Sequence, residues 1–231
     1  MDSARLRKFQ VWFENSKEYH HLKREIFGED VYYVELSKKD PVIIDVGAHI
    51  GLATMYFKML YPKAKMTALE PNPNNFNLLK KNLFENRMED VIVLPVAVGN
   101  EEGEREFFVD SSGEKWFSSG SFSEKSWNEG QNNNKIFVKV VRLSELINDP
   151  VDLIKIDIEG AEKEVLFEIE HKLNKVGMIL FEYHPKRREG AEGIENLFER
   201  NGFKLNFYKY GRNVDWRKAK GLLMGEAINQ R

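Results

Sequence analysis

The stretch Val42-Ile43-Ile44-Asp45-Val46-Gly47-Ala48-His49-Ile50-Gly51 decides the fold of this chain. A short apolar run ends in an acid and a glycine turn, and residues 52–60 then carry apolar side chains at helical spacing. The pattern predicts a buried strand, a glycine turn and a helix. Glycine permits positive φ and the close approach of a ligand. The first turn of the helix is expected to offer N–H groups to an acidic group on that ligand.

A second feature is Glu70, which ends a predicted strand at residues 65–70 and is followed by a proline. It stands nineteen residues after Gly51. An acid at the end of the second strand, about 20 residues from the turn, can bind a ribose diol. The dinucleotide motif G-x-G-x-x-G requires glycine where this chain has His49. The pattern therefore favours an adenosine-containing ligand, and a nicotinamide oxidoreductase is a weaker alternative.

Composition limits the classes of function. The 231 residues suit one α/β domain with a full core. A formal net charge of −2 argues against a general attraction to nucleic acid or anionic lipid. The chain has no cysteine, which excludes disulfides, thiolate metal ligands and a cysteine nucleophile. It shows neither a secretory signal pattern nor an apolar run of the ~20 residues that a membrane span needs, so a cytoplasmic location is predicted.

The N-terminal region is expected to be a helical arm followed by a strand. Residues 3–27 have apolar side chains at helical spacing, with a break at Asn15-Ser16 that would divide them into two helices, and residues 31–36 resemble a strand. The arm could cap a ligand cleft, form a homodimer contact or cover a sheet edge. We favour the last, because sheet edges generally need covering. Residues 1–40 are assigned to the arm and 41–231 to the main domain.

Strands and helices alternate through the rest of the chain, with strands expected to begin near residues 42, 65, 91, 151 and 178. This alternation predicts an α/β fold with a Rossmann-like, doubly wound, mostly parallel sheet. Residues 104–109 and 135–140 could pair at a sheet margin, and residues 203–210 and 222–227 form a closing antiparallel pair. Residues 110–134 are interpreted either as a substrate lid or as a poorly ordered insertion.

Acidic side chains follow several of these strands, and ligands of open parallel sheets bind at the carboxyl ends of the strands. The residues concerned are Asp45, Glu70, Asp157 with Glu159, and Glu182 with His184. The pair Asp157 and Glu159 could supply a proton acceptor or hold a divalent cation, and His184 could accept a proton near neutral pH. Two plainer interpretations stay open: Glu159 caps the next helix, and His184 is an exposed histidine before a proline.

Residues 45–51, 68–73, 153–162 and 180–184 together resemble the motifs of class I S-adenosylmethionine-dependent methyltransferases of the FkbM type. The resemblance covers about residues 40–210, and its most specific part is the lysine-acid-acid-glycine block from Lys155 to Gly160. The family usually has asparagine in place of His49. The resemblance implies a seven-stranded sheet with an antiparallel last strand, S-adenosylmethionine as cofactor, and O-methylation of a hydroxylated small acceptor such as a sugar or natural product.

The resemblance also implies roles for individual residues, which we state as hypotheses. Cofactor contacts are expected from Asp45, Gly47, His49 and Gly51 at the amino-acid end, from Glu70 at the ribose, and from Pro71, Asn72 and Ala97 near the adenine. Asp157, Glu159 or His184 is expected to accept the hydroxyl proton, and no metal ligand is assigned.

Two further alternatives remain. The first is a non-catalytic cofactor-binding or assembly protein. The second, a nucleic-acid base methyltransferase, is less favoured because the turn after the fourth strand, residues 157–160, lacks the Asn/Asp-Pro-Pro-aromatic pattern of base-flipping enzymes.

Overall fold

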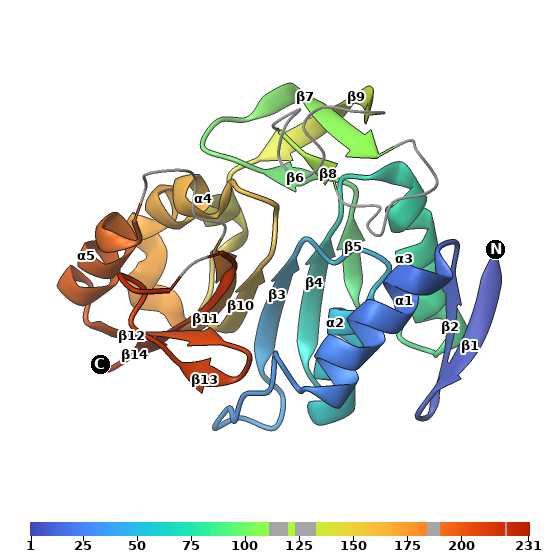
Figure 1. Cartoon of the computed structure of the whole chain (residues 1–231), viewed down its shortest axis with the longest axis horizontal. Helices are drawn as coiled ribbons and strands as arrows, with labels where there is room; N and C mark the ends of the chain where they lie inside the picture. The colour runs from blue at the N-terminus through green and yellow to red at the C-terminus, as the bar shows by residue number, and fades with distance from the viewer. Residues whose placement is uncertain (111–119, 123–132, 184–189, 220) are drawn as a thin grey trace.

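The computed structural model describes residues 1–110, 120–122, 133–183, 190–219 and 221–231. Its centre is an eight-stranded sheet in the order β13-β12-β14-β11-β10-β3-β4-β5 (Figure 1). Neighbours are parallel from β5 to β11, whereas β14 is antiparallel to both β11 and β12. The strands are β3 (Val42–Val46), β4 (Lys65–Leu69), β5 (Ile92–Leu94), β10 (Val151–Ile156), β11 (Val176–Tyr183), β12 (Phe203–Lys209), β13 (Arg212–Asn213) and β14 (Leu223–Asn229). This confirms the predicted Rossmann-like, mostly parallel α/β sheet and its antiparallel last strand. The short β13 adds an eighth strand to the seven expected.

Helices cover both faces of the sheet, as a doubly wound fold requires. Successive side chains of a strand point to opposite faces, so Ile43 packs in one hydrophobic core and Ile44 in the other. The first core contains residues of α2 (Leu52–Leu60) and α3 (Pro73–Glu85), and the second contains residues of α4 (Glu162–Glu168) and α5 (Glu192–Arg200). Two 3₁₀ helices, η2 (Leu143–Leu146) and η3 (Glu170–Lys175), also contribute residues to the second core. Of the helices in the described residues, none is long and apolar enough to span a lipid bilayer.

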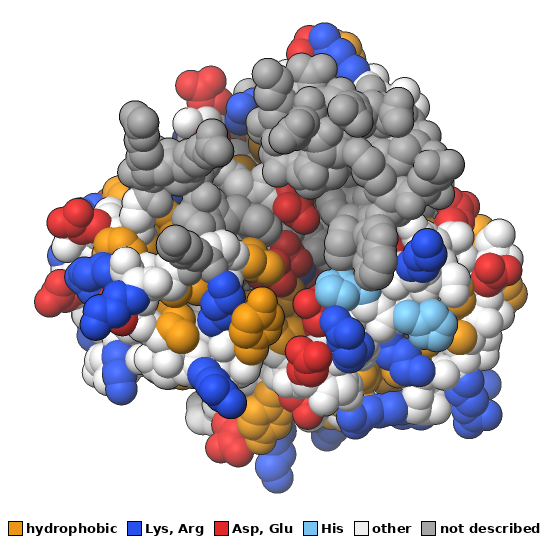
Figure 2. All heavy atoms as spheres, in the orientation of Figure 1, with side chains coloured by type: hydrophobic (Ala, Val, Ile, Leu, Met, Phe, Trp, Pro, Cys, Tyr) orange, Lys and Arg blue, Asp and Glu red, His pale blue; other side chains and the backbone are white. Residues whose placement is uncertain are grey.

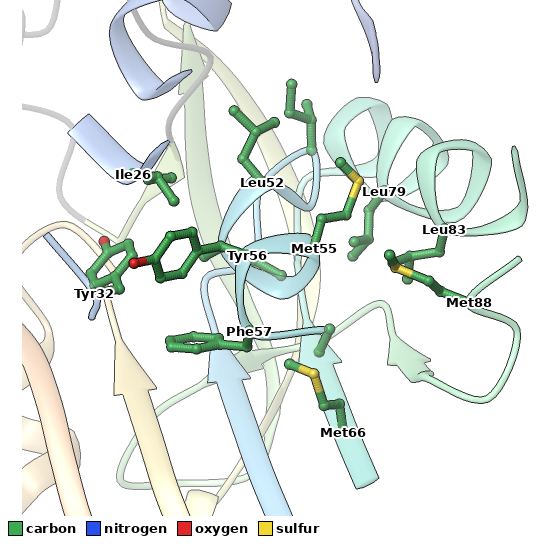
Figure 3. Close-up of a cluster of buried hydrophobic side chains, with 14 of the residues drawn as sticks. Ile26, Tyr32, Leu52, Met55, Tyr56, Phe57, Met66, Leu79, Leu83 and Met88 are labelled. Atoms are coloured by element: carbon green, nitrogen blue, oxygen red, sulfur yellow. The ribbon is translucent and has the colours of Figure 1, made fainter. Parts of the chain in front are cut away.

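Helix α2 is buried on nearly all sides, and it ties the glycine turn to the first core. Its side chains Met55, Tyr56 and Phe57 point in different directions into packed surroundings (Figure 3). Met55 lies on the side of α3, whereas Tyr56 and Phe57 lie on the side of the N-terminal segment (Figure 3). Any displacement of the turn would therefore disturb the core on both sides of this helix.

The N-terminal arm differs from the predicted helix at residues 3–27. It begins with a hairpin of β1 (Asp2–Leu6) and β2 (Phe9–Phe13), and only then follow α1 (Ser16–Lys23) and a π-helical turn, η1 (Arg24–Gly28). The prediction was wrong for the hairpin because Leu6, Phe9 and Phe13 fit a helical spacing by coincidence, while burial in β2 alternates with a period of two. It was right for the helix that starts after Asn15, whose side chain caps α1.

Residues 31–36 form no strand, which corrects a second expectation for this region. Tyr32 and Val34 are buried, and the backbone here bonds to a side chain rather than to a neighbouring strand. The Tyr61 hydroxyl donates to the Val34 carbonyl and accepts from the Leu36 N–H. The arm shares one hydrophobic core with β3 and α2, and the division of the chain at residue 40 stays a prediction.

A second sheet has the order β6-β9-β7-β8 and lies beyond the carboxyl ends of the main strands (Figure 1). It contains β6 (Ala97–Val98), β7 (Gly103–Asp110), β8 (Gly120–Ser121) and β9 (Asn133–Val141). The predicted pairing of residues 104–109 with 135–140 is confirmed, but in this separate sheet rather than at the margin of the main one. The strand expected at residues 91–99 is divided at Pro95, which lacks the N–H of a continuous ladder. Most of the expected lid, residues 111–119 and 123–132, lies outside the described residues.

Candidate active site

A cavity of about 390 Å³ opens at the carboxyl ends of β3, β4, β10 and β11. Residues of α1 and of the second sheet complete its wall. The strand order switches here, since β4 and β10 lie on opposite sides of β3, and the volume is in the range of roughly 300–1,000 Å³ that is usual for ligand sites. Figure 2 shows acidic side chains gathered in a hollow of this face, with histidine beside them. The acids that border the cavity are Glu18, Glu25, Glu70, Asp157, Glu159 and Glu182.

The glycine turn is held tightly between its neighbours. The N–H groups of Gly47 and Ala48 both donate to the carbonyl of Leu69, at 3.0 and 2.9 Å. Gly47 has φ of +79°, and a Cβ at this position would lie 1.9 Å from the carbonyl oxygen of Asp157. These two N–H groups therefore have protein partners and are not available to a ligand. The turn therefore contributes a close backbone surface to the cavity.

Glu70 is 5% exposed and borders the cavity directly after β4. Its Oε2 accepts the N–H of His49 and its Oε1 accepts the N–H of Asn72, both at 2.8 Å. Burial raises the pKa of Glu70, and His49 and the two N–H donors oppose that rise. Both oxygens are thus oriented by backbone that belongs to the same edge of the sheet.

Asp45 and Lys155 form a buried charge cluster below the turn. Asp45 is fully buried, with Thr54 Oγ1 donating to its Oδ2 at 2.6 Å and Lys155 Nζ at 3.3 Å from its Oδ1. Lys155 Nζ also donates to the Gly47 carbonyl at 2.7 Å and lies 3.6 Å from Asp157 Oδ2. Burial lowers the pKa of Lys155, but Asp45 and Asp157 outweigh that effect and the net pKa is raised. Lys155 stays charged, and it joins the ends of β3 and β10.

Two carboxylates at the ends of neighbouring strands share a contact with the N-terminal segment. The Tyr32 hydroxyl lies 3.2 Å from Asp157 Oδ2 and 3.2 Å from Glu182 Oε1. Glu159, two residues further on, also borders the cavity and has φ of +55°. Helix α4 begins after Ala161, so Glu159 is not its N-cap residue, in contrast to one interpretation of the sequence.

Helix α1 connects to the turn through His49, whose Nε2 lies 3.2 Å from the buried carboxylate of Glu18. His21 and Leu22 of the same helix line the cavity. The capping alternative for the arm, which we had favoured less than a covered sheet edge, therefore matches its position. Burial lowers the pKa of His49, whereas Glu18, Glu70 and Asp157 raise it to a net value above the ordinary one.

The pairing of His49 with Glu18 should make stability depend on pH. Because folding raises the pKa of His49, this contribution is complete below about pH 6.5, the unfolded value, and is lost as the pH rises through the higher folded value. We expect Glu18→Gln to lower the free energy of unfolding by about 1 kcal/mol at low pH and by less at high pH. Urea denaturation of both proteins between about pH 6 and pH 9 measures this difference.

Glu25→Gln is the matched control, because it removes the more exposed pair between His21 of α1 and Glu25 of η1. Its expected effect is below about 0.5 kcal/mol. A Glu18→Gln effect of equal size at both ends of the pH range would contradict the protonated pairing.

The structure brings most of the predicted site residues to one cavity. Gly47, His49, Glu70, Pro71, Ala97, Asp157 and Glu159 border it. Three predicted residues do not. Asp45 is buried below the turn, Gly51 is the N-cap residue of α2, and Asn72 caps α3 through its side chain. His184 lies outside the described residues. Among the described residues, no three His, Cys, Asp or Glu side chains are grouped so that they could hold a metal ion.

Sequence reasoning missed Lys155, Tyr32 and Glu18 as parts of the site. Lys155 had a signal, because a charged residue inside a buried apolar strand needs a partner. Tyr32 and Glu18 had none, since both come from the arm, whose packing brings Glu18 to the cavity wall and Tyr32 to two carboxylates that border the cavity.

The chain is similar to known methyltransferases. Residues 45–205 match the family described as the methyltransferase FkbM domain. The 31-O-demethyl-FK506 methyltransferase FkbM of Streptomyces tacrolimicus is 30% identical over 220 residues, which cover 82% of this chain and 83% of that protein. The hexuronic acid methyltransferase AglP of Haloferax volcanii is 27% identical over 168 residues, covering 70% and 64%. For three curated relatives, AglP included, the match spans 64–65% of the relative's own length.

Among solved structures, M. jannaschii TYW2 in complex with AdoMet covers 98% of this chain and 84% of its own, with a TM-score of 0.51 and 16% identity. At that identity the likeness shows a shared class I methyltransferase fold. Because the family match covers most of the chain and includes the glycine turn, Glu70 and the acidic strand ends, the chain belongs to the FkbM family of S-adenosylmethionine-dependent methyltransferases.

Proposed function

We propose that this protein transfers the methyl group of S-adenosylmethionine to a hydroxyl of a small acceptor, a sugar or a natural product. The observation that carries the proposal is that Glu70 and the glycine turn share a single cavity with the carboxylates of Asp157, Glu159 and Glu182. Relatives named for O-methylation and for a hexuronic acid support the class of acceptor.

Glu70 fits the ribose of the cofactor. A carboxylate has about four acceptor sites on its two oxygens, and each oxygen of Glu70 accepts one backbone N–H. Further sites on these oxygens can accept the hydroxyl protons of a diol. Pro71 and Val96 to Val98 supply an apolar wall next to Glu70 for the adenine ring.

The charge of the cavity also fits this cofactor. S-adenosylmethionine supplies, when bound, a methyl group that is already activated by a positively charged sulfonium. Acidic side chains around a cavity favour a bound cation, and the effect is strongest where water is excluded. Glu18 and Glu25 of the arm border the same cavity and add to this field.

The acceptor hydroxyl needs a group that takes its proton, because a neutral alcohol is a weak nucleophile. Asp157 and Glu159 remain our candidates for this role, and Glu182 joins them because it borders the same cavity. His184 stays a prediction. The protein further contributes by aligning the hydroxyl with the methyl group and by limiting water.

Glu70→Ala should weaken the binding of S-adenosylmethionine by about 1–3 kcal/mol, because charge-assisted hydrogen bonds to the ribose are lost. Isothermal titration calorimetry measures the affinity, and thermal unfolding verifies that the variant is folded. Glu168→Ala is a matched control, since Glu168 also accepts a backbone N–H, that of Ser144, but does not border the cavity. Unchanged affinity in a folded Glu70→Ala protein would remove the ribose-binding role.

The function itself is tested with S-adenosylmethionine that carries a labelled methyl group and a panel of hydroxylated sugars and natural products. Transfer of label to an acceptor oxygen, identified by mass spectrometry, is the expected result. Binding of the cofactor without transfer to any acceptor of the panel would favour the non-catalytic alternative. Transfer to nucleic acid would favour a base methyltransferase.

A further inference from the structure

Tyr32 belongs to the segment between η1 and β3, ahead of the residues that match the family. It is 3% exposed, and its ring packs 6.2 Å from the ring of Phe57. Figure 3 shows Tyr32 in the same cluster as Tyr56 and Phe57 of α2. Packing therefore fixes the ring, and the hydroxyl is presented to the carboxylates at the ends of β10 and β11.

The contacts of this hydroxyl are unusual because both of its partners are acids. Tyr32 Oη lies 3.2 Å from Asp157 and 3.2 Å from Glu182, and both carboxylates border the cavity, whereas Tyr32 itself does not. A phenol has one proton to donate, so the two carboxylates must share it. Burial, together with the two nearby acids, raises the pKa of Tyr32 well above its ordinary value. Tyr32 therefore keeps its proton and acts as the donor.

We propose that Tyr32 is a positioning residue which holds Asp157 and Glu182 as a deprotonated pair, and that this pair accepts the proton of the acceptor hydroxyl. The proposal rests on the function proposed above and assigns its proton transfer to one pair. The acceptor O–H bond breaks and its proton goes to a carboxylate oxygen of the pair. The acceptor oxygen bonds to the methyl carbon, and the electron pair of the broken carbon–sulfur bond stays on sulfur.

Other charged groups act on the same pair. Lys155 Nζ lies 3.6 Å from Asp157 and favours its charged form, as does His49 when protonated. Asp157 in turn raises the pKa of the nearby acid Glu25, and Asp45 shares Lys155 Nζ with Asp157, at 3.3 Å from it. The hydrogen bond from Tyr32 favours the deprotonated form of whichever carboxylate accepts it. Its removal should therefore make the pair easier to protonate.

Tyr32→Phe tests this, because the ring and its packing remain and only the hydroxyl is lost. We expect kcat to fall about 10- to 100-fold, since general base catalysis as a whole contributes about 10²–10⁴, with little change in the affinity for S-adenosylmethionine. The acid limb of the kcat profile should move to higher pH by about one unit. Tyr33→Phe is the matched control, because the neighbouring Tyr33 hydroxyl also donates to a carboxylate, that of Glu35 at 2.9 Å, but Glu35 does not border the cavity.

A second measurement needs neither cofactor nor acceptor. In ¹³C-labelled protein, NMR follows the side-chain carboxyl carbons of Asp157 and Glu182 across pH, with Asp157→Asn and Glu182→Gln providing the assignment. Their titration midpoints should rise in Tyr32→Phe and stay unchanged in Tyr33→Phe. In a protein that already carries Asp157→Asn and Glu182→Gln, adding Tyr32→Phe should lower the remaining activity only slightly, because the pair on which Tyr32 acts is already lost.

The outcomes separate this proposal from the function on which it rests. Methyl transfer by the wild type, with unchanged midpoints and an unchanged pH profile in folded Tyr32→Phe, would overturn the role of Tyr32 and leave the function in place. If the titration midpoints of Asp157 and Glu182 rise in Tyr32→Phe but the wild type methylates no acceptor, both the proposed proton transfer and the proposed function would be overturned. Raised midpoints with a shifted pH profile support the proposal.

Discussion

Gly47→Ala is expected to lower the free energy of unfolding by about 4 kcal/mol or more, the upper end for single substitutions. Two effects add. The backbone at Gly47 has φ of +79°, a conformation that costs an L-residue about 1–2 kcal/mol. The new Cβ would also lie 1.9 Å from the Asp157 carbonyl oxygen. That oxygen belongs to backbone at the end of β10, so relief requires β3 and β10 to separate. Since a domain is stable by about 5–15 kcal/mol, urea denaturation should show a protein close to unfolding.

Gly193→Ala provides the control with identical chemistry and the opposite expected sign. Gly193 lies in the first turn of α5, and a Cβ there would make ordinary contacts of 3.6 Å or more. Alanine should stabilise this helix by about 0.5–1 kcal/mol. A Gly47→Ala protein as stable as the wild type would mean that the turn can move away from β10.

Lys155→Met should lower the free energy of unfolding by about 3–5 kcal/mol, because it leaves the buried carboxylate of Asp45 without its cation. Lys155 is 2% exposed and Asp45 is fully buried. The methionine side chain is close in size, so the expected loss comes from charge and from the bond to the Gly47 carbonyl. Chemical denaturation near neutral pH measures it. Asp45→Asn in the same protein should recover part of the loss, because it removes one of the two charges that Lys155 balances.

Lys58→Met is the matched control for a buried lysine. Lys58 is 5% exposed, but its carboxylate partner Asp90 is 63% exposed and can be solvated when the lysine is lost. The expected cost is roughly 1–2 kcal/mol, mainly for the carbonyl groups that Lys58 contacts. Equal losses for the two lysines, or no recovery with Asp45→Asn, would contradict a charge cluster below the turn.

The parallel part of the fold was predictable because its signals are local. Each parallel strand contains a short apolar run, and a helix follows β3, β4 and β10 directly. When strands and helices alternate in this way, the strands are usually parallel and the crossover connections between them are almost always right-handed. The arm was predicted less well, since Leu6, Phe9 and Phe13 have a helical spacing, while Phe9 and Phe13 also fit the alternation of β2. A short segment can carry two periodicities, and only its contacts with α3 and α2 decide between them.

The site, too, was predictable only in part: the sequence located the edge of the sheet but not the direction of every side chain. Glu70 and Gly47 border the cavity as expected, because the end of a strand determines where the next residue lies. Asp45 shares the motif but faces Lys155 below the turn, because alternate residues of a strand point to opposite sides. The pattern located the edge of the sheet, and side-chain direction within that edge depended on register with β10.

The order of apolar runs, the glycine turn and the acids after the strands by themselves determined the sheet, the family and the edge of the sheet at which the cavity opens. Only the tertiary structure decided that Glu18, Glu25 and Tyr32, all remote in sequence from the motif, complete that edge. The physical reason is that backbone periodicity acts over a few residues, whereas the arm is placed by burial of its own apolar side chains against α2. Burial has no direction along the chain, so the partners that it brings together cannot be read from spacing.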